Sequence, residues 1–140
     1  MRKMIISLTK DIIPITREQD VVLLRNRVKE FAVKIKMGLV NQTKLITAAS
    51  ELVRNMMKYG GGGKVILEIV TKGRENGVRI QFTDEGPGIA DINLAMKDGY
   101  SSGKSLGLGL PGAKRLVNDF NISSTLGQGT SVTILKWANG

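Results

Sequence analysis

The chain has 140 residues, the size of one domain, and 41% hydrophobic with 24% charged residues is a globular rather than a disordered composition. It has no cysteine and no histidine, which excludes a disulfide framework, a thiolate metal site and any catalytic imidazole. The net charge of +9 comes from 21 basic and 12 acidic residues spread along the chain, and aromatic residues make up only 4%. An acidic protein or a nucleotide therefore suits this charge better than a nucleic acid does.

The N-terminal third predicts an extended segment and then a helix. Residues 3–9 and 11–15 have strand character, and Pro14 indicates a sheet edge. Asp20 is the expected N-cap of a helix whose apolar residues recur every three or four positions, and Gly38 is its expected end.

A second helix follows, with Asn41 as its expected N-cap and Gly60 just past its end. The remaining elements expected are a strand over 64–71, a hairpin turn at 74–77, a strand over 78–83, a short helix near 91–97, a helix with Pro111 in its first turn and a face reaching Phe120, and strands over 121–126 and 130–137. Together they predict an α+β two-layer sandwich, a mixed and mostly antiparallel sheet with helices on one face, formed by a single domain over residues 1–140.

The second helix carries the first polar cluster of interest. Glu51 and Asn55 are four residues apart and so share one helix face, about 6 Å apart along the axis. A carboxylate can take a proton from an attacking hydroxyl, and an amide oxygen can ligate Mg²⁺. Taken alone, the cluster is more simply a solvated stripe in which Glu51 pairs with Arg54.

The second cluster is the turn from Asp84 to Gly88 at the end of a strand. A carboxylate at this place can accept a hydrogen bond from an exocyclic amine of a base, and two glycines let the backbone approach a planar ring closely. An ordinary Gly/Pro turn with an acidic first residue explains the same residues equally well.

The third cluster is the glycine-rich run from Ser101 to Gly112, which leads into a helix. Free backbone N–H groups and the positive end of a helix dipole favour phosphate there. Two better-known motifs do not fit. The Gly107, Gly109 and Gly112 pattern follows a polar loop instead of an apolar strand and has no later ribose-binding carboxylate, and Asp98 stands where a P-loop has its first glycine.

The order and spacing of the clusters are more specific than any one of them. E-x-x-x-N on a helix, D-x-G-x-G after a hairpin, G-x-G-L opening a helix and a final Gly129-Thr130 resemble, in sequence, the boxes of the GHKL (Bergerat) ATPases. The stretches 86–92, 98–102 and 106–116 are similar to the RsbT-type serine/threonine switch kinases of bacterial stress signalling. This resemblance covers essentially the whole chain after residue 10.

The resemblance implies a kinase that uses ATP and Mg²⁺. Glu51 would orient or deprotonate the acceptor hydroxyl, Asn55 would ligate the metal, and Asp84 would hold the adenine amine. Lys104 would contact a phosphate. The residues implied in nucleotide binding are Asn55, Asp84, Gly86, Gly88, Ile89, Ser102, Gly103, Lys104, Gly107, Leu108, Gly109, Leu110 and Thr130.

The resemblance also implies partners and a location. The substrate would be a STAS-domain regulator of the stressosome type, and the released kinase would bind and activate an output protein such as a phosphatase. No nucleic acid and no membrane are expected as partners, and a homodimer is left open. No apolar run approaches the roughly 20 residues of a membrane span, and the N-terminus lacks the apolar stretch of a signal peptide, so a cytoplasmic location is expected.

Two alternatives stay open. The chain could act chiefly as an anti-sigma factor kinase that sequesters a sigma factor, which co-purification with a polymerase subunit would reveal. It could also be a basic nucleic-acid-binding module, which steeply salt-dependent DNA binding without an effect of ATP would reveal.

Overall fold

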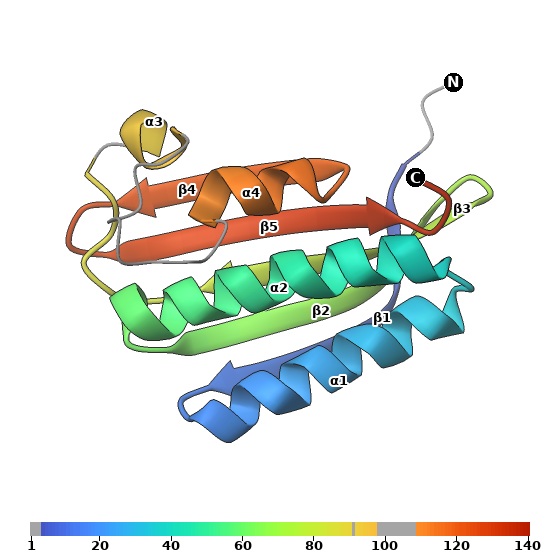
Figure 1. Ribbon diagram of the computed structural model, residues 1–140, viewed down its shortest axis with the longest axis horizontal. Helices are drawn as coiled ribbons and strands as arrows, with labels where there is room; N and C mark the ends of the chain where they lie inside the picture. The colour runs from blue at the N-terminus through green and yellow to red at the C-terminus, as the bar shows by residue number, and fades with distance from the viewer. Residues whose placement is uncertain (1–3, 91, 98–108) are drawn as a thin grey trace.

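The computed structural model describes residues 4–90, 92–97 and 109–140 (Figure 1). Alternating apolar side chains form the strands of a sheet. Five strands pair in the order β1-β2-β3-β5-β4, and every pairing is antiparallel. The strands are β1 (Ile6–Ile15), β2 (Gly63–Lys72), β3 (Glu75–Thr83), β4 (Asp119–Thr125) and β5 (Gly129–Trp137). The expected antiparallel sheet is therefore confirmed, but the described strands include no parallel pair that would make it mixed, and β1 with its Pro14 lies at one edge.

Helices cover one face of this sheet. They are α1 (Glu18–Lys34), α2 (Leu39–Gly60), α3 (Ile92–Ala95) and α4 (Gly109–Arg115). α1, α2 and α4 lie side by side over the sheet, with α2 in the middle, whereas α3 lies beyond its end (Figure 1). The core forms between the helices and the sheet, and its largest fully buried side chains are Ile15, Leu24, Leu45, Leu67, Ile80 and Ile134. No helix among the residues that the structure describes is long and apolar enough to cross a membrane.

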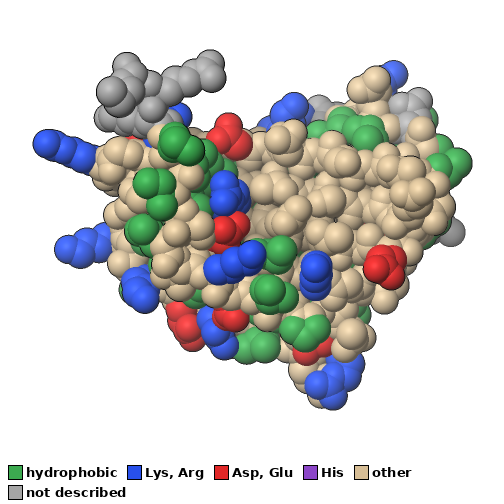
Figure 2. Space-filling model, turned by 180° about the vertical axis from the view of Figure 1, so that it is seen from behind, with side chains coloured by type: hydrophobic (Ala, Val, Ile, Leu, Met, Phe, Trp, Pro, Cys, Tyr) green, Lys and Arg blue, Asp and Glu red, His purple; other side chains and the backbone are tan. Residues whose placement is uncertain are grey.

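The other face of the sheet is not covered by helices. Figure 2 shows this side, where charged and hydrophobic side chains gather toward one end and one margin and the middle is mostly uncharged. By strand alternation, this face holds Gln81, Thr83, Asn121, Ser131 and Thr133, with Gln81 Nε2 donating to Ser131 Oγ at 3.3 Å.

The ends of the helices differ from the expectations. Asp20 is not the N-cap of α1. Arg17 takes that place, and Asp20 lies in the first turn, where its Oδ2 accepts from the backbone N–H groups of Thr16 at 2.8 Å and Arg17 at 2.9 Å. These hydrogen bonds lower the pKa of Asp20. α1 ends at Lys34, before Gly38, because Met37 turns into the core and its N–H donates to Ala32 O.

The start of α2 and the hairpin are also shifted. Gly38, not Asn41, is the N-cap of α2, and Gly61 in the left-handed conformation ends it. The turn between β2 and β3 falls at Gly73 and Arg74, because Lys72 pairs with Glu75. The helix expected to reach Phe120 ends at Arg115, and Phe120 belongs to β4.

Candidate functional site

Asp84 is the best-defined polar group of the candidate site, at the end of β3. Its Oδ1 accepts the backbone N–H groups of Gly86 at 2.9 Å and Thr130 at 3.3 Å, and its own N–H donates to Thr130 O at 3.0 Å. Two hydrogen bonds to Oδ1 fix the carboxylate, which leaves Oδ2 to meet a donor from outside the turn.

The end of α2 lies directly against this carboxylate. A Cβ built on Gly60 would come 2.6 Å from Asp84 Oδ2, and one built on Gly86 would come 2.6 Å from Gly60 Cα. Such distances are closer than real side chains allow, so only glycine fits at both positions. The structure therefore joins the C-terminal end of α2 to the Asp84 turn.

Glu51 and Asn55 lie on α2 within the last three turns before Gly60. Glu51 is buried, 5% exposed, although it is a carboxylate, and Asn55 is half-buried. Glu51 Oε1 lies 3.9 Å from Nη1 of the exposed Arg54, at the outer limit of an ion pair, so this contact adds little stability. A buried carboxylate on the face that carries Asn55 does not match the solvated stripe that the sequence also allowed.

Gly88 and Thr130 complete the turn around Asp84. Gly88 has a φ of +78°, and a Cβ there would come 2.5 Å from Thr125 O. Thr130 lies at the start of β5 and its hydroxyl is 2.9 Å from Ser124 Oγ. The backbone N–H groups of Gly86 and Thr130 thus contact the carboxylate, and Gly86 and Gly88 add no side chain to the turn.

Ser124 is a structural residue of this site that the sequence analysis missed. Its Oγ accepts from the N–H of Ile89 at 2.7 Å and donates to Gly129 O at 3.0 Å, so it ties the loop after Asp84 to the turn between β4 and β5. A partial signal was present, because a hairpin turning at 127–129 places residue 124 opposite Thr130. The contact with Ile89 spans 35 residues and no local pattern reveals it.

The glycine-rich run is described only from Gly109 onward. Gly109 is buried at the start of α4 with a φ of +68°, and Leu110 packs against the core. The predicted phosphate-binding residues Ser102, Gly103, Lys104, Gly107 and Leu108 lie outside the described residues.

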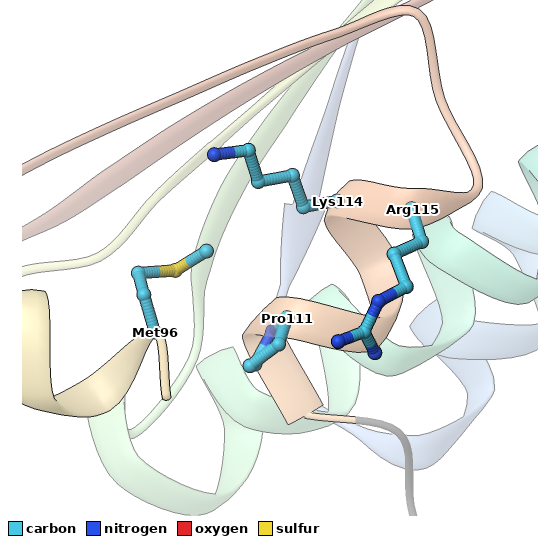
Figure 3. A pocket seen from close by; sticks show the side chains of 4 residues that line it. All are labelled: Met96, Pro111, Lys114 and Arg115. Carbon is cyan, nitrogen blue, oxygen red and sulfur yellow. The ribbon is translucent and has the colours of Figure 1, made fainter. Parts of the chain in front are cut away.

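An open pocket of about 450 Å³ lies between α3 and α4 (Figure 3). Met96 lines it from the end of α3, and Pro111, Lys114 and Arg115 line it from α4. None of the residues predicted for nucleotide binding is among these four, so we do not assign this pocket to the nucleotide.

The donor set suits magnesium only in the presence of a phosphate ligand. No group of three or more Asp, Glu, His or Cys side chains that could hold a metal occurs in the described part of the chain. Mg²⁺ keeps several waters and commonly takes one or two protein oxygens together with substrate phosphates. The amide oxygen of Asn55 fits that requirement.

Comparisons with known proteins found a matching family model and several similar proteins. A family model described as histidine kinase-, DNA gyrase B-, and HSP90-like ATPase matches residues 40–139. The chain is 41% identical over 123 residues to the serine/threonine-protein kinase RsbT of Bacillus subtilis (strain 168), covering 88% of this chain and 92% of the relative. It is 28% identical over 127 residues to an anti-sigma F factor of Thermoanaerobacter sp. (strain X514), covering 88% and 89%.

A solved structure has the same fold. The RsbU and RsbW domains of a Mycobacterium tuberculosis protein match with a TM-score of 0.64 and 17% identity over 92% of this chain. The match covers 32% of that longer chain, so the present chain spans about a third of it. At this identity the likeness shows the fold alone.

Proposed function

Because this chain belongs to the histidine kinase-, DNA gyrase B- and HSP90-like ATPases, and within them to the RsbT-type serine/threonine-protein kinases, we propose that it phosphorylates a STAS-domain protein in a partner switch. The observation that carries the proposal is the contact of Gly60 with Asp84. That contact brings the helix face of Glu51 and Asn55 to the turn that would hold the base.

The proposed nucleotide site assigns a task to each group. Asp84 Oδ2 accepts the amine of adenine while Oδ1 stays bound to the turn. Gly86, Gly88 and Ile89 line the base with backbone atoms, together with Thr130. The run from Ser102 to Leu110 binds the phosphates through its N–H groups and, in our proposal, through Lys104.

Phosphoryl transfer then needs positioning and charge neutralisation. The acceptor hydroxyl of a Ser or Thr forms a bond to the γ-phosphorus of ATP, the bond from that phosphorus to the bridging oxygen breaks, and ADP leaves. Glu51 takes the hydroxyl proton. Mg²⁺, when bound, neutralises phosphate charge, and Asn55 is the residue that would hold it.

A labelled-phosphate assay tests this proposal. The full chain is incubated with labelled ATP, Mg²⁺ and the STAS-domain protein encoded beside it, and label is expected on a Ser or Thr of that protein. Asn55→Ala should abolish transfer, and Glu51→Ala should slow it by about 100-fold, a size typical of a general base. Transfer by Asn55→Ala at the unaltered rate would remove the metal-binding role.

A second role is also part of the proposal. After release from its phosphorylated STAS partner, the kinase would bind and activate an output protein such as a phosphatase, in the cytoplasm where ATP is available. An Asn55→Ala variant that has lost transfer but still activates the output protein would separate this role from catalysis.

The 28% identity to an anti-sigma F factor supports one competing function, the sequestration of a sigma factor. The identity to RsbT is higher, so we rank sigma-factor sequestration second. Co-purification of the chain with a sigma factor, and not with a STAS-domain protein, would reverse that order.

A further inference from the structure

Lys136 is a charged residue at a position of β5 where its neighbours on the same face are apolar core residues. The positions of β5 that face the helices are Val132, Ile134 and Lys136, with Ala138 just beyond the strand, and Lys136 is only 3% exposed. A buried ammonium group is costly unless an anion or a hydrogen-bond acceptor compensates it.

The described residues supply no such compensation. Among the residues that the structure describes, no ion pair or hydrogen bond involves the side chain of Lys136. Every fully buried polar side-chain atom of those residues does have a partner, so the ammonium tip of Lys136 keeps a small opening to solvent. The stem is buried and the charge is directed at the surface.

A second lysine lies on the face of α2 that meets the end of β5, because Lys44 follows by three residues Asn41, whose Nδ2 donates to Ala138 O. Lys44 is exposed on α2. Burial lowers the pKa of the Lys136 ammonium, and the nearby positive charge of Lys44 is the second cause that lowers it. No ion pair of Lys44 occurs within the described residues either. The sequence from Phe31 to Ser50 contains no acidic residue, so the first three turns of α2 carry no counter-charge.

The backbone around Lys136 is held firmly. Asn118 N–H donates to Leu135 O at 2.9 Å, and the N–H of Trp137 donates to Asn118 Oδ1 at 2.9 Å. Asn41 Nδ2, on the first turn of α2, donates to Ala138 O at 3.2 Å. Lys136 is thus fixed between α2 and the segment after α4, and a ligand would not have to order it.

An apolar contact surface adjoins the two ammonium groups. Val40 lies four residues before Lys44 and shares its helix face, and it is 69% exposed. Leu39 beside it is 76% exposed. Paired cations next to exposed aliphatic side chains match an acidic segment that also carries apolar residues, and free phosphate would use only the cations.

We propose that Lys44, Lys136 and Val40 form a docking site for an acidic segment of a protein partner, with a carboxylate between the two ammonium groups. The inference rests on the proposed function, because it names the surface by which the released kinase would hold its output protein. This site is at the N-terminal end of α2, whereas the nucleotide residues are at its C-terminal end (Figure 1).

Binding of fluorescent poly-L-glutamate to the full chain, measured by anisotropy, tests the site. Lys44→Gln and Lys136→Met should each weaken binding about tenfold, as expected for loss of one hydrogen bond to a charged group. The matched control is Lys29→Gln, which removes one exposed lysine from α1 and should change the affinity less than about twofold. Because Lys44 is exposed, its variant should keep the fold, which circular dichroism verifies.

Equal affinities for all three variants would overturn the site. Inorganic phosphate that displaces the peptide at equal concentration, or tighter binding to phosphatidylserine vesicles than to the peptide, would overturn the assignment to a protein partner. Phosphoryl transfer to the STAS-domain protein should stay unchanged in Lys44→Gln and Lys136→Met. Absence of transfer by the unaltered chain would instead contradict the proposed function and leave the docking result intact.

Discussion

Asp84 uses one carboxylate oxygen for the protein and leaves the other for a ligand. An asparagine at this position can still present a carbonyl oxygen to the N–H groups of Gly86 and Thr130, but its second atom becomes a donor. The amine of adenine is also a donor, so the contact is lost.

Asp84→Asn should therefore weaken ATP binding about 100-fold and change the unfolding midpoint little. Calorimetric titration with ATP and Mg²⁺ measures the affinity. Glu85→Gln is the matched control, since Glu85 is the exposed neighbouring carboxylate and should leave affinity within about twofold. Unchanged affinity in Asp84→Asn would remove Asp84 from the base pocket.

Glu68 and Arg79 form a two-point ion pair on the uncovered face of the sheet, with Oε1 to Nε at 3.2 Å and Oε2 to Nη2 at 3.3 Å. Burial alone would raise the pKa of Glu68, but hydrogen bonds from Arg79 and Ser7 and nearby positive charges together outweigh it and lower that pKa. A carboxylate with a lowered pKa in the folded state stabilises the fold above its ordinary value of 4.5, and this stabilisation is lost as the pH falls through the folded-state pKa.

Glu68→Gln should reduce the free energy of unfolding by about 1 kcal/mol at pH 7. The difference from the unaltered chain should shrink below about pH 4.5 and be smallest near pH 3. Urea unfolding at the two pH values measures it. Glu30→Gln, in the exposed pair with Arg27 at 3.7 Å, should cost less than about 0.5 kcal/mol at both. A pH-independent loss in Glu68→Gln would show that packing, not charge, is responsible.

At the scale of the elements, the junction between α2 and the Asp84 turn depends on a missing side chain. Gly60→Ala should displace the Asp84 carboxylate from its two N–H donors, because the new methyl group would overlap it. We expect a loss of about 2 kcal/mol in unfolding free energy together with weaker ATP binding.

Gly38→Ala is the control for this change, since it is also a glycine at an end of α2 and no atom lies within 4 Å of the new Cβ. It should cost about 0.5 kcal/mol, because alanine is a poorer N-cap than glycine, and should leave ATP binding unchanged. Thermal and urea unfolding with parallel nucleotide titration compare the two. Equal losses would mean that the close approach at Gly60 does not position Asp84.

Element types were predictable from the sequence, but several of their ends were not. The strands and both long helices follow from apolar periodicity, which depends on burial and is repeated over many residues. The end of α1 depends on a single event, the burial of Met37, which forces Lys36 to a φ of +60° before Gly38 is reached. One tertiary contact thus overrode the local preference for glycine at the turn.

At the scale of the whole molecule, the proposed nucleotide touches α2, the end of β3 and the start of β5. A ligand that binds only the folded state stabilises it by mass action, by about 2.7 kcal/mol at a free concentration 100 times the dissociation constant. Saturating ATP with Mg²⁺ should therefore raise the unfolding midpoint by several degrees. Asp84→Asn, with a dissociation constant about 100 times larger, should gain only about 0.4 kcal/mol at that concentration, and its midpoint should rise much less. If ATP raises the unfolding midpoint of neither protein, nucleotide binding is contradicted.

The candidate site was predictable as a set of motifs but not as a surface. Glu51, Asn55, Asp84, Gly86 and Gly88 could be selected because their order and spacing form a pattern. The glycine contact at residue 60 and the Ser124 link to Ile89 join segments that are 24 and 35 residues apart, and such contacts depend on the tertiary packing of the sheet. Lys136 gave no signal, because one lysine in an alternating strand does not show which neighbours surround it.

The single 22-residue helix α2 carries both ends of the proposed switch. Eleven residues separate Lys44 from Asn55, a span of about 16 Å at the rise of an α-helix. A small molecule bound at one end does not reach the other end, so competition between the substrate and the output protein must arise from steric overlap of the two large partners. A short acidic peptide and a nucleotide should accordingly occupy the same copy of the chain together, while two full-length partners compete.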